Sequence, residues 1–201
     1  MRSVEESLER IGAESLDLVL VHDPDDHLSQ AIAEGIPALL ALRDSGRIGA
    51  VGAGMNDEIG LVRIVETTDI DCVMEAGRFT LLDRTAEREL LPLCAERGVT
   101  VLAAGVFNSG LLASPRPGAR FNYAPVESRM LEAALAMKAA CARHGVTLAS
   151  AALQHPRRHP TVGSVVLGAR DPREVRECLA GLRVAVPDEL WEELDTLAVL
   201  R

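Results

Sequence analysis

Residues 15–26 read Ser-Leu-Asp-Leu-Val-Leu-Val-His-Asp-Pro-Asp-Asp, an apolar run that ends at His22 and a group of carboxylates. Such a run predicts a buried strand that carries polar side chains at its C-terminal end. Parallel α/β folds keep their functional sites at that end of their strands. The stretch therefore predicts a parallel α/β fold with His22 as a candidate site residue, although only one helix's worth of chain precedes the strand.

Composition limits the classes of protein to be considered. A chain of 201 residues with a net charge of -9 fits one domain, 1–201, without a general affinity for nucleic acid or anionic membranes. We find neither an apolar run of membrane-spanning length nor a signal peptide, so the sequence predicts a soluble, cytoplasmic protein. The four cysteines are far apart and without a Cys-x-x-Cys pair, which predicts buried free thiols.

Short apolar runs alternate with helical patterns along the chain. Runs that are apolar on both faces and alternate with helices predict a parallel sheet covered by helices. The five predicted strands are 16–21, 48–53, 72–76, 99–104 and 162–167.

Several helix boundaries also have local signals. The first helix places Val4, Leu8 and Ile11 on one apolar face. Ser29 and Asp57 are candidate N-caps, whereas the predicted helices 86–97 and 127–144 end at glycines. Asp171-Pro172 combines an N-cap with proline at the first helical position.

Two architectures remain open at this point. The strand spacing fits βαβ units, so the chain is either an open doubly wound sheet or a (β/α)8 barrel that lacks three units. No Gly-x-Gly-x-x-Gly follows the first strand, which disfavours the open nucleotide-binding sheet. Gly52-Ala53-Gly54 is weaker: it predicts either a tight strand-to-helix turn or a close approach to a ligand.

The residues around His22 permit two chemical interpretations. His22, Asp23, Asp25, Asp26 and His27 include metal-ligand types, but side chains alternate in direction along a strand and Pro24 forces a turn. We therefore expect no metal site. A single histidine that donates a proton or a hydrogen bond to an oxygen is favoured over a purely structural role.

Two further loops follow predicted strands. Gly168-Ala169-Arg170-Asp171-Pro172 joins a strand to a helix N-terminus, where free N–H groups and Arg170 would suit a phosphate. Residues 106–110 would form a companion loop. By contrast, the two prolines in the segment 154–160, Gln-His-Pro-Arg-Arg-His-Pro, predict a solvent-exposed connector rather than a binding site.

Five motifs, in this order along the chain, resemble the aldo-keto reductase family. The resemblance spans essentially the whole chain and is closest to the branch with D-threo-aldose 1-dehydrogenase, L-fucose dehydrogenase and L-galactose dehydrogenase. The motifs are Leu-Val-His-Asp-Pro-Asp (20–25), Ser-Gly-Arg-Ile-Gly-Ala-Val-Gly (45–52), Gly-Arg-Phe-Thr-Leu-Leu-Asp (77–83), Phe-Asn-Ser-Gly-Leu-Leu (107–112) and Gly-Ala-Arg (168–170).

This resemblance implies an α/β protein with strands four to eight of a TIM barrel and an NAD(P)-dependent oxidoreductase activity. Hydride would move between nicotinamide and a sugar or a small aldehyde or ketone. His22 would orient and polarise the reacting oxygen, and Arg78 and Phe79 would line the substrate pocket. The resemblance assigns cofactor binding to Asn56, Phe107, Asn108, Ser109, Gly168, Ala169, Arg170, Glu174 and Glu177.

The resemblance also bears on the choice of cofactor and on competence. Glu174 stands where NADP-preferring members carry an arginine, so NAD is favoured over NADP because a carboxylate repels a phosphate. The family's catalytic Tyr, Asp and Lys belong to the first three strands, and Tyr123 does not match that position. We therefore expect an N-terminally truncated domain with impaired catalysis, or alternatively an inactive cofactor-binding or partner-binding module. The oligomeric state stays open.

Overall fold

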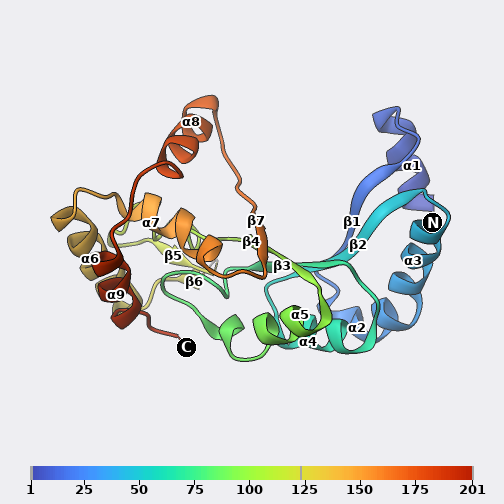
Figure 1. Ribbon diagram of the computed structural model, residues 1–201, viewed down its shortest axis with the longest axis horizontal. Coiled ribbons are helices and arrows are strands. Elements are labelled where there is room, and N and C mark those ends of the chain that lie inside the picture. The colour runs from blue at the N-terminus through green and yellow to red at the C-terminus, as the bar shows by residue number, and fades with distance from the viewer. Residues whose placement is uncertain (1, 123, 201) are drawn as a thin grey trace.

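The protein is described by a computed structural model that covers residues 2–122 and 124–200, so Tyr123 lies outside the described residues. A five-stranded sheet in the order β1-β2-β3-β4-β7 runs through the molecule, and all its neighbouring strands are parallel (Figure 1). The predicted parallel α/β fold is confirmed. The strands are β1 (Leu16–His22), β2 (Ile48–Met55), β3 (Cys72–Ala76), β4 (Thr100–Ala104) and β7 (Val162–Val165).

Helices connect the strands, and an antiparallel pair of two-residue strands, β5 (Arg120–Phe121) and β6 (Ala124–Pro125), lies outside the main sheet. The helices are α1 (Arg2–Ile11), α2 (Leu28–Gln30), α3 (Ile36–Asp44), α4 (Glu58–Thr67), α5 (Leu90–Arg97), α6 (Ser128–Arg143), α7 (Leu148–Gln154), α8 (Pro172–Gly181) and α9 (Asp188–Thr196).

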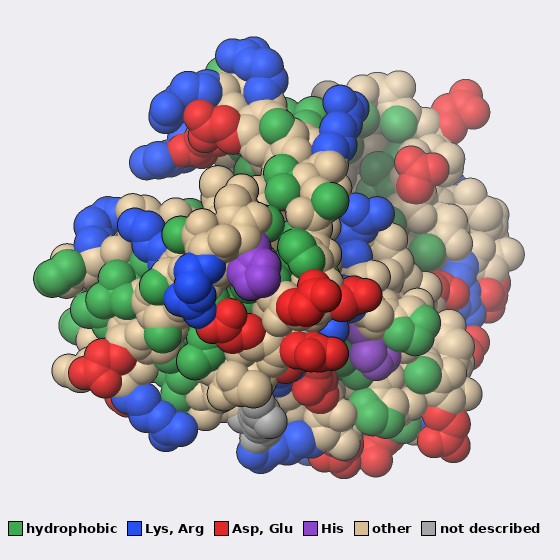
Figure 2. Space-filling model, turned by 60° about the vertical axis from the view of Figure 1, so that its left-hand side comes forward, with side chains coloured by type: hydrophobic (Ala, Val, Ile, Leu, Met, Phe, Trp, Pro, Cys, Tyr) green, Lys and Arg blue, Asp and Glu red, His purple; other side chains and the backbone are tan. Residues whose placement is uncertain are grey.

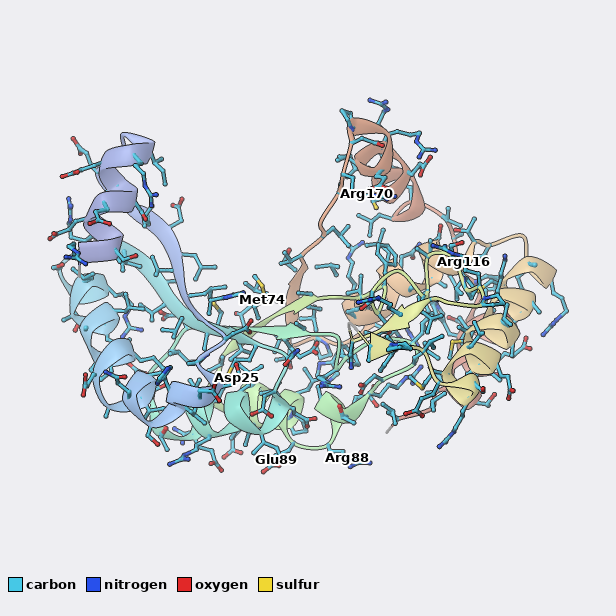
Figure 3. The ribbon with its side chains drawn as sticks, turned by 180° about the vertical axis from the view of Figure 1, so that it is seen from behind. Asp25, Met74, Arg88, Glu89, Arg116 and Arg170 are labelled. Atoms are coloured by element: carbon cyan, nitrogen blue, oxygen red, sulfur yellow. The ribbon has the colours of Figure 1, made fainter. Side chains whose placement is uncertain are left out.

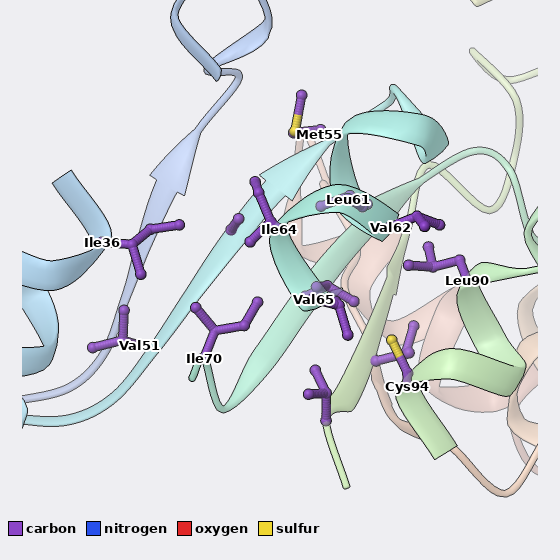
Figure 4. Close-up of a cluster of buried hydrophobic side chains, with 14 of the residues drawn as sticks. Ile36, Val51, Met55, Leu61, Val62, Ile64, Val65, Ile70, Leu90 and Cys94 are labelled. Atoms are coloured by element: carbon purple, nitrogen blue, oxygen red, sulfur yellow. The ribbon is translucent and has the colours of Figure 1, made fainter. Parts of the chain in front are cut away.

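One face of the sheet is sealed by α3, α4 and α5. Val51, Val73 and Val101, at alternate positions of three strands, are completely buried on that face. Figure 4 shows the cluster that they join, in which Leu61 and Ile64 of α4 pack against the sheet. This apolar layer holds the strands in register and so fixes where their C-terminal ends lie.

The opposite face of the sheet is less covered. Met74, Ala76, Leu102 and Ala104 occupy the alternating positions of β3 and β4 and stay partly exposed. Figure 3 shows Met74 on the side of the sheet turned away from α4 and α5. The protein therefore has one sealed face and one partly open face.

A second apolar cluster lies beside the sheet, where α6, α7 and α9 pack together (Figure 1). Met137, Ala151 and Leu190 are completely buried in it. Leu111 and Leu112, which follow β4, also belong to this cluster and anchor the loop before them.

Several local predictions are confirmed. The Asp57 carboxylate caps α4 by accepting from Gly60 N at 3.1 Å. Asp171 caps α8 by accepting from the backbone N–H groups of Arg173 and Glu174. Gly98 ends α5 in the left-handed conformation, with φ 68°.

Other predictions need correction. Ser29 lies inside α2, because the turn at Asp25–His27 leads directly into the helix and starts it earlier. Ile11 is 66% exposed and does not join Val4 and Leu8 in the core. A 3-10 turn, Thr85–Glu87, precedes α5, so the predicted helix 86–97 starts only at Leu90.

Of the two roles predicted for the glycines of β2, the tight turn is wrong, because Gly52 and Gly54 lie inside the strand. A Cβ at Gly52 would come within 2.4 Å of the Cys72 carbonyl oxygen and 2.7 Å of a Leu20 methyl group. Gly52 therefore allows β1, β2 and β3 to pack side by side, and its role in the fold is close packing of strands.

Candidate active site

Polar residues follow the C-terminal ends of neighbouring strands, as the sequence predicted. His22 ends β1, Asn56 follows β2 and Arg78 lies two residues after β3. The register places His22 opposite Gly54, and Met55 opposite Glu75. The parallel register thus brings these predicted site residues together at the C-terminal ends of three neighbouring strands.

His22 presents its imidazole to the outside of the described chain. Its side chain is 82% exposed, and its Nε2 lies 3.7 Å from Asp23 Oδ2. Asp23 has a positive φ of 42°, and its backbone N–H donates to the Gly54 carbonyl at 2.9 Å. This contact ties the end of β1 to β2 and leaves the ring of His22 accessible for hydrogen bonding to a ligand.

The acidic residues beside His22 do not converge on a point. Asp25 begins a 3-10 turn that ends at His27, and the His27 N–H donates to the Pro24 carbonyl at 2.8 Å. Within residues 2–122 and 124–200, no three His, Cys, Asp or Glu side chains are grouped as metal ligands.

Arg78 links two of the strand ends. Its Nε donates to the Asn56 carbonyl at 2.8 Å, and its Nη1 donates to Asp83 Oδ2 at 3.2 Å. The side chain is 28% exposed, while that of Asp83 is completely buried. The guanidinium therefore has one side at the surface and one held by a buried carboxylate, a position suited to contact a polar ligand.

Phe79 has a different environment from the predicted pocket wall. The residue is 2% exposed, and its ring lies 5.0 Å from the His155 ring and 5.8 Å from the His159 ring, measured between centroids. Its side chain belongs to the core of the described chain. The two adjacent side chains thus point in different directions: Arg78 reaches the surface and Phe79 points into the core.

The predicted loop after β4 is built from left-handed residues. Gly105, Asn108, Ser109 and Gly110 all have positive φ, with Asn108 at 44° and Ser109 at 57°. Asn108 is 2% exposed; its Nδ2 donates to the Gly77 carbonyl at 3.3 Å, and its Oδ1 has no partner among the described residues. Phe107 packs against the second apolar cluster. The structure thus joins this loop to the end of β3 and leaves one buried acceptor there.

The loop after β7 is exposed, but its charges are already paired. Gly168, Ala169 and Arg170 are all exposed. The Arg170 Nε donates to Glu174 Oε1 at 2.9 Å, and the Arg170 N–H donates to Glu174 Oε2 at 2.8 Å. These bonds raise the pKa of Arg170 and lower the pKa of Glu174. Arg170, which was predicted to bind a phosphate, and Glu174, which was predicted to accept from a ribose hydroxyl, therefore bind each other.

The N-terminus of α8 also differs from the predicted anion site. Asp171 Oδ1 already accepts from the first two N–H groups of the helix, at 2.8 and 2.9 Å. Glu177, further along α8, lies 3.6 Å from Arg173 and is 61% exposed. A phosphate at this helix end would have to displace the Asp171 carboxylate, so the expected set of free N–H donors is not present.

The segment around His155 is only in part the predicted exposed connector: Arg157, Arg158 and Pro160 are exposed. His155 is 2% exposed and Pro156 is buried, whereas Arg158 lies at the surface with its guanidinium 4.6 Å from the centre of the Trp191 ring. Phe79 and Trp191 supply aromatic contacts that come from distant parts of the chain. The composition of residues 154–160 alone did not reveal them.

Glu75 and Asp83 are the residues that the sequence reasoning missed. Both are completely buried beside Arg78. A carboxylate in the otherwise apolar run of β3 was the available signal for Glu75.

Comparison with known proteins places this geometry in a family. The profile described as "Aldo/keto reductase family" matches residues 1–199. The chain belongs to this family. The resemblance found in the sequence is therefore confirmed, including the similarity to D-threo-aldose 1-dehydrogenase and L-galactose dehydrogenase.

Individual relatives of the family show how much of them this chain spans. It is 38% identical to a pyridoxal 4-dehydrogenase of Microbacterium luteolum, over 96% of this chain and 60% of the relative. It is also 38% identical to a D-threo-aldose 1-dehydrogenase of a Pseudomonas species, over 96% of this chain and 59% of the relative. The chain thus spans about three-fifths of the length of these family members.

Solved structures of the family share the fold. The aldo-keto reductase AKR11C1 from Bacillus halodurans, in its holo form, matches with a TM-score of 0.78 and 24% identity. The match covers 98% of this chain and 66% of that protein. The parallel sheet described above is therefore the sheet of an aldo-keto reductase.

Figure 2 shows acidic and basic side chains interspersed over the visible face of the molecule. No helix within residues 2–122 and 124–200 has the length and apolar character needed to span a lipid bilayer.

Proposed function

We propose that this chain supplies strands four to eight of an aldo-keto reductase barrel that acts as an NAD(P)-dependent oxidoreductase. The observation that carries the proposal is the placement of His22, Asn56 and Arg78. Each lies at the C-terminal end of one of three neighbouring parallel strands. Family membership supports it. The substrate would be a sugar or a small aldehyde or ketone, because relatives are named for an aldose, galactose and pyridoxal.

The residues at the strand ends fit a nicotinamide cofactor. Asn108 Oδ1 is a buried acceptor without a partner among the described residues, and an amide N–H is a suitable donor for it. The largely buried loop at 107–109, in which Ser109 is exposed, and the exposed loop at 168–170 would bind the remainder of the cofactor, with Asn56 near the nicotinamide end. When bound, the cofactor would accept or donate a hydride.

His22 would act on the oxygen of the substrate. An exposed imidazole at a strand end can donate a hydrogen bond to a carbonyl oxygen, or accept one from a hydroxyl, and so orient and polarise that group. Arg78, held by Asp83 and by the Asn56 carbonyl, would contact other oxygens of the substrate. Phe79 is buried, so its contribution would be to support Arg78 from behind.

Glu174 supports a preference for NAD. A carboxylate that already binds Arg170 offers no net positive charge to the 2′-phosphate of NADP, whereas it can accept a hydrogen bond from a ribose hydroxyl. Substitution E174R would give two arginines at this position and should reverse the preference. Glu177, which pairs with Arg173, would add further negative charge near the adenosine end.

We also propose that the five strands need three more to close a barrel. The relatives are longer than this chain, and β1 and β7 are the edges of the described sheet. The Tyr, Asp and Lys that the family draws from its first three strands would then come from the added segment, so turnover by this chain alone would be impaired.

Complementation tests the proposed function. The N-terminal two-fifths of the Pseudomonas aldose dehydrogenase would be co-expressed with this chain, and NAD reduction would be measured with a panel of aldoses. We expect turnover only with both parts present, and a loss of about 100-fold in kcat for H22Q, typical of an acid-base group. H27Q is the matched control because His27 is an exposed histidine at the end of the adjacent turn.

Three outcomes would decide the proposal differently. Unchanged kcat in H22Q in an active complex would refute the role of His22. Binding of NADH or NADPH by this chain without turnover in any complex would instead support an inactive cofactor-binding module. Absence of cofactor binding by the reconstituted complex would contradict the oxidoreductase proposal itself.

A further inference from the structure

Glu75 is a buried carboxyl in a position that normally suits an apolar side chain. It lies in β3 on the face covered by helices, with Val73 before it on the same face, and is 0% exposed. Ionising a carboxyl in such a place costs several kcal/mol unless partners compensate. Retention of Glu75 in this layer therefore calls for a specific role.

The contacts of Glu75 lead to the candidate site. Its Oε1 accepts from the Arg78 backbone N–H, and its Oε2 has no hydrogen-bond partner within the described residues. Arg78 in turn donates from Nε to the Asn56 carbonyl at 2.8 Å and from Nη1 to Asp83 at 3.2 Å. A connected path thus runs from Glu75 through Arg78 to the residue that follows β2.

The charged groups around this path are unbalanced. The pKa of Glu75 is raised to about 8, mainly by burial and also by the negative charge of Asp83, while the backbone N–H and the charge of Arg78 oppose the rise. Glu58, at the start of α4, faces the same Asp83 and Arg78 and also Arg88, and burial raises its pKa as well. Asp83 therefore binds the Arg78 guanidinium directly, while Glu75 and Glu58 act on the same guanidinium through their charge.

We propose that Glu75 is a positioning residue that sets the place of the Arg78 guanidinium at the strand ends. The structure shows Arg78 bound to Asp83 and to the Asn56 carbonyl together, and we assign this arrangement to the neutral form of Glu75. With Glu75 ionised, a second negative charge beside Asp83 draws the guanidinium inward and weakens its bond to Asn56. The consequence for ligand binding rests on the proposed function, whereas the contact itself can be measured without any ligand.

Nuclear magnetic resonance of the arginine groups tests the contact. The backbone amide and the Nε of Arg78 would be followed from pH 5 to pH 9.5. We expect both signals to shift with a common midpoint near the raised pKa of Glu75, about 8. Both shifts should vanish in E75Q, which keeps the size of the side chain, and persist in the matched control E58Q.

Two results would overturn the proposal: a titration that survives in E75Q, or a shift of the amide without any shift of Nε. The second would mean that Glu75 holds the backbone but does not position the guanidinium. Substitution D83N gives a separate test if E75Q does not fold. Removing the Asp83 charge should lower the midpoint, and an unchanged or higher midpoint contradicts the inference.

Titration with NADH at pH 6.5 and pH 9 in the reconstituted complex separates this inference from the proposed function. If wild type binds NADH more weakly at pH 9 than at pH 6.5, and E75Q binds it equally at both pH values, the positioning role and the proposed function are both supported. Absence of binding at both pH values refutes the proposed function, and the Arg78 spectra then decide the positioning role alone.

Discussion

His155 shows how strongly a single buried side chain can depend on distant parts of the chain. The pKa of His155 is lowered to about 3, mainly by burial and also by the positive charges of Arg84 and Arg158, while Asp195 opposes the shift. Neither ring nitrogen has a hydrogen-bond partner among the described residues. The imidazole therefore behaves as a neutral, mostly apolar ring between Phe79 and Trp191.

Replacement of this ring by phenylalanine should remove a pH dependence. The folded protein keeps His155 neutral, whereas the unfolded chain protonates it below its ordinary pKa of 6.5. Wild-type stability should thus rise from pH 3 to pH 6.5, by up to about 1.4 kcal/mol per pH unit from this residue. H155F should flatten that rise and retain or increase the free energy of unfolding at pH 7, because no hydrogen bond is lost.

Denaturant unfolding at each pH measures this change in the free energy of unfolding. The control is H144Q, because His144 is exposed. The opposite titration of Glu75, which lowers stability between its ordinary pKa of 4.5 and about 8, is common to both proteins and cancels in the difference. An equal slope for wild type and H155F between pH 3 and pH 6.5 would contradict the buried neutral ring.

At this scale the sequence predicted positions better than environments. His22, Asn56 and Arg78 were placed at strand ends because the end of an apolar run is a local signal. The burial of Phe79 and His155 depends on contacts with segments far away in the chain, which no local pattern contains. The Arg170–Glu174 pair joins the loop before α8 to the first turn of the helix, so it depends on how the chain enters α8 and not on a periodicity within the helix.

Among the elements, α8 is held to the rest of the protein by few contacts. Gly181 is its only buried residue, and Val175 and Leu179 are 46% and 53% exposed. Figure 1 shows the helix standing apart from the body of the molecule. Its order therefore depends strongly on its own N-cap, Asp171.

Removal of this cap should loosen α8 without unfolding the protein. D171A deletes two hydrogen bonds at the helix start, a change typically worth about 1 kcal/mol. Amide hydrogen exchange within α8 should therefore accelerate about 5-fold, while the strands keep their protection. D188A is the control because Asp188 makes no cap hydrogen bond in α9, and equal acceleration in α8 for both variants would refute the role of the cap.

Helix boundaries were predictable where the signal is a side chain that bonds its own helix, as at Asp57 and Asp171. They were not predictable where the preceding chain decides the start. Pro24 and the turn after it make α2 begin at Leu28, one residue before Ser29. For a related reason the sequence predicted a turn or a close approach to a ligand at the glycines of β2: the close packing that requires Gly52 involves Leu20 and Cys72 of the neighbouring strands.

For the whole molecule, the main property is a sheet with two edges. The described sheet begins with β1 and ends with β7, and Leu18 in β1 and Val166 after β7 are 39% and 37% exposed. Unpaired strand edges with apolar side chains are templates for association. The protein in isolation should therefore self-associate.

Sedimentation velocity over a range of concentrations measures this association. Wild type should form larger species as the concentration rises, and L18K should reduce them because a lysine at an edge strand opposes pairing. I59K adds the same charge at Ile59, which is 78% exposed on α4 and not part of an edge strand, and should have little effect. A monodisperse wild type at every concentration would be incompatible with exposed sheet edges.

The choice between an open sheet and a barrel could not be made from periodicity, because both architectures repeat the same βαβ unit. The ordered motifs pointed to the family, and the comparisons confirmed it. The number of strands in a complete molecule is a property of long-range closure, which local patterns do not encode.

The slight burial of α8 has an evolutionary consequence. Most substitutions in a natural protein are removed because they destabilise a packed core. Nine of the ten residues of α8 lie outside that core, since Gly181 is the buried one. Mutations at Glu174 and Glu177 can therefore accumulate at little cost in stability. Under the proposed function, such mutations would let a lineage exchange one nicotinamide cofactor for the other while the rest of its fold stays under constraint.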